Sequence, residues 1–586
     1  MRKTLLKSLA AATALALLAG TATGCGAEKP VFSGPVELAY VPLDDRPDNV
    51  ERVEYLAESL GYTLAMPDAE LYATKLDGQP LNTDGTQSGN RAALYEWVLT
   101  REAAGCDRYV LSLDQLLSGG LVNSRHTEAS DPVTLSSGET LAETELLDAL
   151  LSALAKDEKN QVWLLDSVMR LAPTVGYAGF GLAEYNSLRD FGMLPRPALS
   201  GEALTVENIL NDYWYHPDGT AIDPGDPIFY GTATHYLAAR ERKLRLSAET
   251  QRVLAQAEYG NFHLLVGIDD SSAEDSIQKN EIAFLRQSLR EGDALLSGVD
   301  DLAFKAIAKL YLADCGWAGA KTAVRYVGGL EAEAACAYDY QPLNTLVAEH
   351  LAFFDLQESS NPEKADFQIV VLTAPAEPER TGDYAWLLTD ILNTNRANHM
   401  PTILIDAAND AYGTVIHDML TDQVELGGLL AYSGFLDMAI VTGTAISHGV
   451  ARYAWLKATP APEMEDAANT AFAKALSDSV VKDFAYRNTV RNDLYVYVRD
   501  ELGGSPDNFD SPPIDQTAVL NALEAGMTVS AAPVLANFSG EKILVGLDPW
   551  AEADCGTLSL SNSRFPWSRV FEIGMDIHRE LSAPVS

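Results

Sequence analysis

The chain has 586 residues, of which 47% are hydrophobic and 21% are charged, a composition typical of a folded globular protein and not of a disordered one. Because a single hydrophobic core stops growing at roughly 250–300 residues, this length predicts two or more domains. The net charge of −41 argues against nucleic acids and other anionic polymers as partners, since such a protein would repel their phosphates.

Residues 1–24 have the features of a secretory signal peptide. Three basic residues, Arg2, Lys3 and Lys7, lie before or at the start of an apolar run that ends at Leu18. This run is too short for a spanning helix, which needs about 20 residues. The junction Ala22-Thr23-Gly24-Cys25 resembles a bacterial lipobox. We therefore expect Cys25 to be lipidated and residues 25–35 to tether an exported protein to the outer face of the cell membrane. A plain signal peptide cut nearby is the alternative.

Four cysteines remain after this segment, namely Cys106, Cys315, Cys336 and Cys555. Their spacing contains no CxxC metal clip, and four cysteines in so long an exported chain do not form a dense disulfide framework. A pair between Cys315 and Cys336 is conceivable, but free thiols are the prediction.

A buried strand is predicted at residues 36–43, and it runs into Asp44, Asp45 and Arg46 before a helix begins near Asn49. In α/β folds, ligands bind at the carboxyl ends of the strands. We therefore expect the acids at such ends to converge on one pocket. The same pattern, an apolar run that ends in one or two aspartates, recurs at Asp114, Asp166, Asp269 with Asp270, Asp300 with Asp301, and Asp406.

Strands alternate with helices along most of the chain, which predicts the α/β class, with parallel sheets covered by helices. Residues 36–300 are predicted to form a first α/β domain, either (β/α)-barrel-like or a doubly wound parallel sheet. Within it, residues 172–231 are rich in Gly, Pro and aromatic residues and are interpreted as an insertion. Residues 301–458 are predicted to form a second, doubly wound α/β domain, and residues 459–586 a helical and β C-terminal region, a small α+β tail.

Seven motifs are spread along the chain, namely VPLDDRPDN (41–49), LSLDQLLSGGLVNSR (111–125), DSVMR (166–170), GIDDSSAED (267–275) with Glu281 behind it, SGVDD (297–301), ILIDAAND (403–410) and FPWSRVFE (565–572). Together they resemble the bacterial domain-of-unknown-function family number 4127. The resemblance covers most of the mature chain and implies no established reaction. The chain departs from the family pattern at Asp301, where a glutamate is usual, and at Phe435-Leu436-Asp437, where Trp-Asn-Thr is usual.

The first functional hypothesis is a surface-anchored, carbohydrate-active hydrolase. Glycosidases use one carboxylic acid to protonate the leaving oxygen and a second as nucleophile, base or stabiliser, and Asp269, Asp270 and Asp44 are the candidates. Helix capping is the alternative for each Asp-Asp pair. Substrate binding is predicted for Asp45, Arg46, Asn49, Asp114, Ser124, Arg125, Asp166, Arg170, Glu281, Asp300, Asp406 and Asn409.

Two other hypotheses stay open. A divalent-metal hydrolase of phosphate or amide bonds would use aspartates with Asn409 and His126 or His448, although no HExxH, HxH or DxDxDG spacing is present. A lipid-anchored protein that only binds a polar solute such as a sugar would need the same aspartates and aromatics. The first and third hypotheses require no cofactor, and the expected partner is a small-molecule or carbohydrate substrate. The oligomeric state is not determined by the sequence.

Overall fold

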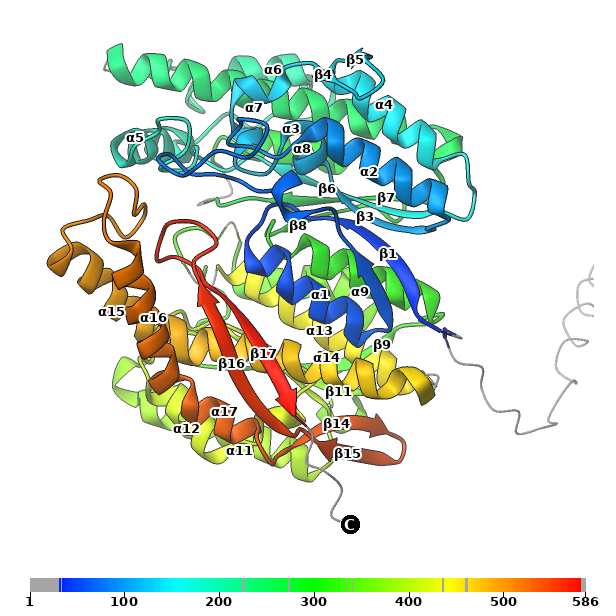
Figure 1. Ribbon diagram of the computed structural model, residues 1–586, viewed down its shortest axis with the longest axis vertical. Coiled ribbons are helices and arrows are strands. Elements are labelled where there is room, and N and C mark those ends of the chain that lie inside the picture. Colours follow the sequence, from blue (N-terminus) through cyan, green and yellow to red (C-terminus); the bar gives the residue numbers. More distant parts are fainter. Residues whose placement is uncertain are drawn as a thin grey trace, which may run out of the picture.

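The computed structural model describes residues 31–32, 34–223, 227–271, 275–334, 336–339, 341–434, 437–458 and 462–580. The predicted signal peptide, the lipidation site Cys25 and the first part of the tether lie outside the described residues. Within the described chain the fold is α/β, as predicted, with two parallel sheets and small antiparallel sheets (Figure 1).

The first sheet has six strands and is open. Its order puts β1, the first strand, in the second position, with β2 and β8 as the edges. The sheet is therefore doubly wound, and the barrel-like alternative is not the one observed. All neighbouring strands in it are parallel. In spatial order the strands are β2 (Tyr62–Ala65), β1 (Val36–Val41), β3 (Arg108–Ser112), β6 (Gln161–Val168), β7 (Phe262–Ile268) and β8 (Ala294–Ser297).

Helices cover both faces of this sheet. α1 and α9 lie on the face toward the second sheet, and the other helices lie on the opposite face (Figure 1). The predicted insertion at residues 172–231 contains α5 and α6 and the start of α7. The helices are α1 (Glu51–Ser59), α2 (Arg91–Ala104), α3 (Leu113–Ser118), α4 (Glu143–Leu154), α5 (Leu182–Met193), α6 (Val206–Asp212), α7 (Pro227–Leu254), α8 (Lys279–Gln287) and α9 (Leu302–Asp314), with a short hairpin of β4 (Val133–Thr134) and β5 (Thr140–Leu141).

The second sheet has five parallel strands and repeats the order of the first, with its own first strand in the second position. Its strands in spatial order are β10 (Leu356–Glu358), β9 (Ala320–Val327), β11 (Phe367–Leu372), β12 (Thr402–Asp406) and β13 (Ala431–Gly434). Its helices are α10 (Leu343–Phe353), α11 (Thr381–Ala397), α12 (Val415–Gln423) and α13 (Met438–Lys457).

The C-terminal region packs helices and two β-hairpins against the second sheet (Figure 1). Its strand pairs β14–β15 and β16–β17 are antiparallel. The elements are α14 (Pro462–Val481), which runs on through π-helical turns at Lys482–Val490, α15 (Arg491–Val496), π-helical turns at Tyr497–Glu501, α16 (Gln516–Ser530), α17 (Ala532–Phe538), β14 (Lys542–Leu547), β15 (Trp550–Asp554), β16 (Thr557–Arg564) and β17 (Gly574–Glu580).

One continuous hydrophobic core joins the two sheets. It contains side chains from β1, β6 and β11 together with α1, α9 and α13, which lie between the sheets (Figure 1). Successive side chains of each strand point to opposite faces of the sheet, and both faces are buried. In β6, for example, Trp163 and Leu165 enter this central core, whereas Val162, Leu164 and Val168 enter the core beneath the outer helices. This alternation decides which strand-end acids can reach a common pocket.

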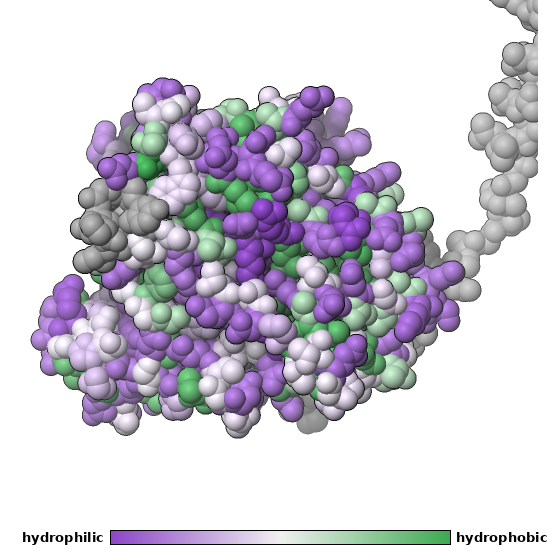
Figure 2. Space-filling model, turned by 90° about the horizontal axis from the view of Figure 1, so that it is seen from above, coloured by the Kyte–Doolittle hydropathy of each residue, from purple (hydrophilic) through white to green (hydrophobic). Residues whose placement is uncertain are grey.

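The four cysteines Cys106, Cys315, Cys336 and Cys555 are free thiols, as predicted. Within the described residues no single helix combines the length and apolar character of a membrane span; the bent pair α16 and α17, at 45°, passes that test by length and composition. Seen from above, the face formed by the outer helices of the first sheet is largely hydrophilic, with hydrophobic residues scattered among the polar ones (Figure 2).

Candidate functional site

A cavity of about 440 Å³ lies where the two sheets and the C-terminal region meet. Segments that follow the carboxyl ends of β1, β3, β6, β7 and β8 form one wall, and segments after β9, β12 and β13 form another. Trp567, Arg569 and Phe571, from the segment between β16 and β17, complete it. The cavity therefore occupies the position that α/β sheets normally offer to ligands.

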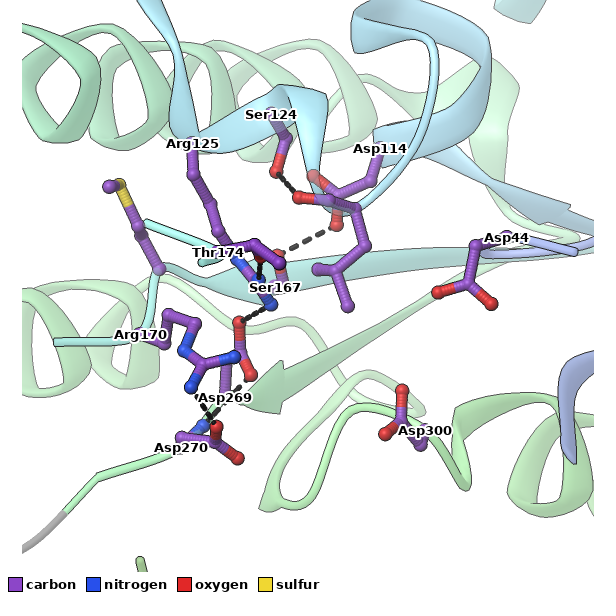
Figure 3. A network of polar contacts seen from close by, with 12 residues as sticks. Asp44, Asp114, Ser124, Arg125, Ser167, Arg170, Thr174, Asp269, Asp270 and Asp300 are labelled. Carbon is purple, nitrogen blue, oxygen red and sulfur yellow. Dashed lines mark hydrogen bonds and ion pairs between the residues drawn. The ribbon is translucent and has the colours of Figure 1, made fainter. Parts of the chain in front are cut away.

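Two arginines hold the Asp-Asp pair at the end of β7. Arg125 donates to Asp269 over 2.6 Å, and Arg170 lies 2.6 Å from Asp270. Figure 3 shows both arginines directed at these two carboxylates. Burial alone would raise the pKa of Asp269, but Arg125 and Arg170 outweigh burial and lower it below the ordinary range. Asp269 is therefore a carboxylate at neutral pH.

Arg46 is fixed at the cavity wall by two aspartates. Asp44 accepts from the backbone N–H of Arg46 over 3.0 Å and from its Nε over 2.9 Å, and Asp300 accepts from Nη1 over 3.0 Å. Asn49 also donates to Asp44, over 3.0 Å. Asp44 has no exposed surface, whereas Asp300 lines the cavity. Asp44 and Asn49 thus orient Arg46 from behind. Burial raises the pKa of Asp300, although Arg46 opposes this.

Asp437 is an acid of the cavity with a raised pKa. It lies between β13 and α13, and its carboxyl group accepts a hydrogen bond from the Cys336 thiol over 3.1 Å. Burial, followed by the charge of Asp270, raises the pKa of Asp437 to about 8, while the thiol acts in the opposite direction. Asp437 is accordingly a protonated carboxylic acid at neutral pH, in the same cavity as the ionised Asp269.

Among the described residues, arginines line the cavity beside its six aspartates. Five arginines line it, namely Arg46, Arg125, Arg170, Arg491 and Arg569. The guanidinium of Arg569 forms no hydrogen bond or ion pair with any other described residue, and it lies 4.3 Å from the centre of the Trp567 ring. Burial and the neighbouring Arg46 lower its pKa to about 10, so it is still cationic at neutral pH.

The structure places Asp114 and Asp166 behind the wall of the cavity. Both pair with Lys243 of α7, which lies 2.5 Å from Asp166, and Ser167 donates to Asp114 over 2.7 Å. The cause is the alternation of β6: Asp166 points to the same face as Leu164, beneath the outer helices. This buried triad fastens α7 to β6 and α3.

Glu281 and Ser124 also lie outside the cavity lining. Glu281 pairs with Arg240, whose Nη1 donates to the carbonyl of Arg170 over 2.8 Å, so Glu281 positions the strand end that carries Arg170. Ser124 is buried, and its hydroxyl donates to the carbonyl of Leu121 over 2.7 Å (Figure 3).

In the second sheet, Asn409 lines the cavity, whereas Asp406 does not. Asp406 pairs with His417 over 3.1 Å in a buried cluster that includes Asp483 and Tyr432. This cluster belongs to the core of the second sheet. Of the acids expected to converge, the cavity thus receives Asp269, Asp270 and Asp300, together with Arg46, Arg125, Arg170 and Asn409.

Asp45 joins the first motif to the last. Its carboxylate accepts from the indole N–H of Trp567 over 2.8 Å and from the backbone N–H of Thr74 over 3.2 Å. Burial and the adjacent Asp44 raise the pKa of Asp45 to about 6. It holds the Trp567 wall of the cavity in place and belongs to the frame of the site.

The sequence interpretation did not select Asp437 or Arg569 as site residues. Asp437 follows a buried strand, as the predicted site acids do, but it stands in a segment that departs from the family pattern. Arg569 stands in the FPWSRVFE motif, more than 500 residues after Arg46. Only the docking of that motif onto residues 44–46 reveals its position.

Two groups of side chains among the described residues have metal-ligand geometry. They are His126 with Glu128 and His235, and Asp406 with His417 and Asp483. None of these residues lines the cavity. His448, the other histidine considered for a metal site, is buried beside Phe472 in the core.

A family model described as a protein of unknown function, DUF4127, matches residues 38–185 and 230–576. The chain belongs to the DUF4127 family. The resemblance carried by the sequence motifs is therefore confirmed. Comparisons with curated proteins and with solved structures find no match.

The matched ranges of this DUF4127 protein include every described residue that lines the cavity. The unmatched stretch, residues 186–229, falls inside the insertion predicted at residues 172–231. Leu182 and Tyr185, at the start of α5, are the last cavity residues before that stretch. The cavity is accordingly built from the DUF4127 parts of the chain.

Proposed function

We propose that this DUF4127 protein is a hydrolase of glycosidic bonds and that the cavity between the two sheets is its active site. The observation that supports this most is the separation of acid strengths within one cavity: Asp437 has a pKa raised to about 8, while the pKa of Asp269 is lowered. Acid–base catalysis needs one protonated and one ionised carboxyl group, and opposed environments are how proteins obtain both at one pH.

In this proposal Asp437 is the general acid. It donates its proton to the glycosidic oxygen as the bond to the anomeric carbon breaks, which leaves the sugar with oxocarbenium character. Asp270, held by Arg170, acts on the anomeric carbon as nucleophile or activates the water that attacks it. Water finally supplies a hydroxyl to the sugar, and its remaining proton returns to Asp437, directly or by way of Asp270 and solvent, so both carboxyl groups return to their initial states. Asp269 and Arg125 support Asp270 from behind.

The substrate expected in this cavity carries a negative charge. Arg569 is a cavity cation without a carboxylate partner among the described residues, and Trp567 and Phe571 lie beside it. Guanidinium groups bind carboxylates and phosphates in bidentate fashion, and aromatic rings stack on the apolar faces of sugars. A sugar acid or a sugar phosphate meets both requirements. Arg569 and Trp567 would select it, and neutral sugars would leave Arg569 unpaired.

The proposed location is the outer face of the cell membrane, through a lipid on Cys25. The support is the sequence of residues 1–25 alone. A site for polymeric or cell-surface carbohydrate fits such a location. A second candidate function, capture of an anionic sugar without turnover, is favoured by the position of the cavity between two α/β lobes. The same residues would serve it, with Asp437 as a hydrogen-bond donor.

The test is turnover of chromogenic glycosides of neutral and acidic sugars by the purified protein, with and without a chelator. We expect chelator-resistant hydrolysis of an acidic glycoside that Asp437→Asn abolishes. Asp500→Asn, at an exposed aspartate paired with Arg499, is the matched control and should leave the rate unchanged. Tight binding of an acidic sugar without turnover would replace this proposal with the capture function. Turnover that a chelator removes would favour the metal-dependent hydrolase.

A further inference from the structure

Two histidines and a glutamate meet outside the cavity, next to the turn that carries the cavity residue Arg125. His126 follows the short 3-10 turn Asn123–Arg125, Glu128 lies in the next turn, Thr127–Ser130, and His235 projects from α7. Glu128 Oε2 lies 3.9 Å from His235 Nε2. Within this group, one ligand atom of each residue lies within 4.8 Å of the other two.

The two imidazole Nε2 atoms are buried and make no hydrogen bond with a described residue. His126 as a whole is only 2% exposed. The rings of Tyr177 and Phe180 pack around it, with centroids 5.2 Å from the His126 ring in each case. A buried polar nitrogen without a hydrogen-bond partner is unfavourable, so two of them at one point indicate a missing ligand.

The chemistry of the three ligands is that of zinc. Zinc takes imidazole nitrogens and carboxylate oxygens at about 2.0–2.2 Å in tetrahedral sites, often as two histidines, a glutamate and water. Such bonds separate neighbouring ligand atoms by about 3.3–3.6 Å. The Glu128 side chain is 70% exposed and is free to move inward by the small distance required.

The second group with metal-ligand geometry, Asp406 with His417 and Asp483, has no unpaired imidazole nitrogen. His417 already uses both ring nitrogens, with Asp406 at 3.1 Å and with Asn488 at 2.9 Å. Its imidazole has no free position for a metal unless these contacts break. That cluster is a completed hydrogen-bond network, and it provides a matched control.

We propose that His126, Glu128 and His235 form a zinc site that fastens the turn carrying Arg125 to α7. Arg125 precedes His126 directly and binds Asp269 in the cavity, and Arg242 of α7 already donates to the carbonyl of Ser124 over 3.1 Å. Zinc would add a second link between the same two segments. The ion has a structural role there, and this inference does not depend on the function proposed for the cavity.

The test is zinc binding by the purified full chain after treatment with a chelator. Titration calorimetry and elemental analysis should show one zinc ion per chain, and cobalt in its place should give the absorption of a tetrahedral site. Bound zinc should also raise the melting temperature. Glu128→Gln, at an exposed position that leaves the fold intact, and His235→Gln should each weaken zinc binding by more than about tenfold. His417→Gln should leave it unchanged.

Absence of zinc binding would overturn the proposal, because a water molecule would then be the partner of the two nitrogens. Zinc binding that survives in Glu128→Gln and His235→Gln but is lost in His417→Gln would overturn it as well. The readouts are binding and stability, so they hold even for a chain without any hydrolase activity.

Discussion

The indole N–H of Trp567 donates to the carboxylate of Asp45 over 2.8 Å, across 522 positions of sequence. A second contact runs beside it, from the backbone N–H of Asp48 to Glu572 over 3.3 Å. The last motif of the chain is thus docked on the first, and this docking brings Arg569 to the cavity. The site exists only when the C-terminal region is folded against the first sheet.

Trp567→Phe should destabilise the protein while keeping the aromatic wall. The substitution removes one donor to a buried carboxylate, which costs about 1–3 kcal/mol. The hydrogen bond from Trp567 stabilises the charged form of Asp45, whose pKa is raised to about 6. The loss of unfolding free energy in Trp567→Phe should therefore be larger at pH 8 than at pH 5. Urea unfolding at both pH values measures it. Trp386→Phe, at a ring that is 60% exposed, is the control, and an equal loss there would refute the docking role.

Lys243→Met should be among the most destabilising single changes in the first sheet. It removes the cation shared by Asp114 and Asp166 and leaves two buried carboxylates without it, at a cost of about 3–5 kcal/mol. Chemical denaturation should show this loss. Lys309→Met removes a pair with the exposed Asp355 and should cost less than about 1 kcal/mol. If Lys243→Met lowers the free energy of unfolding by less than about 1 kcal/mol, the triad does not fasten α7.

Arg569→Gln should raise KM for an acidic glycoside, or Kd for an acidic sugar, by at least about tenfold, because a charge-assisted hydrogen bond contributes about 1.5–3 kcal/mol. The effect on a neutral analogue should be small. Arg499→Ala, at an exposed arginine, is the control. Equal losses for acidic and neutral ligands would show that Arg569 supports the fold and does not recognise charge.

Asp437 should make stability depend on pH. Its pKa is raised in the folded state from 3.8 to about 8, so the folded state holds a proton that the unfolded chain has released. The resulting stabilisation is complete below about pH 4 and is lost as pH rises toward 8. Across this window the wild-type protein should lose stability relative to Asp437→Asn, on the order of a few kcal/mol. If stability changes with pH in the same way in the wild-type protein and in Asp437→Asn, the pKa of Asp437 is not raised.

The strands and their carboxyl ends could be predicted from the sequence because apolar runs and the acids after them are local features. Which of these acids share a pocket could not. Asp166 and Asp269 both follow or end apolar runs, yet one lies beneath α7 and the other faces the cavity, since side chains of a strand alternate between faces. The sequence also left open whether the first sheet is open or closed into a barrel. That depends on the order of its strands, in which β2 forms the edge beside β1.

The contributions of the second sheet and the C-terminal region were harder to predict. Asp437 stands after a strand, but its raised pKa arises from burial in the folded chain and then from the charge of Asp270, which is 167 positions earlier. Arg569 becomes a cavity residue only through the contact between Asp45 and Trp567. Both facts are tertiary, and neither composition nor spacing contains them.

The pH dependence of kcat/KM for an acidic glycoside tests the proposed role of Asp437 most directly. We expect kcat/KM to fall above about pH 8 as a single proton is lost from Asp437. Cys336→Ala removes the thiol that lowers this pKa and should move the fall to higher pH. A profile that stays level through this range, or a fall that Cys336→Ala leaves in place while Asp437→Asn remains active, would contradict the assignment of Asp437 as the catalytic acid.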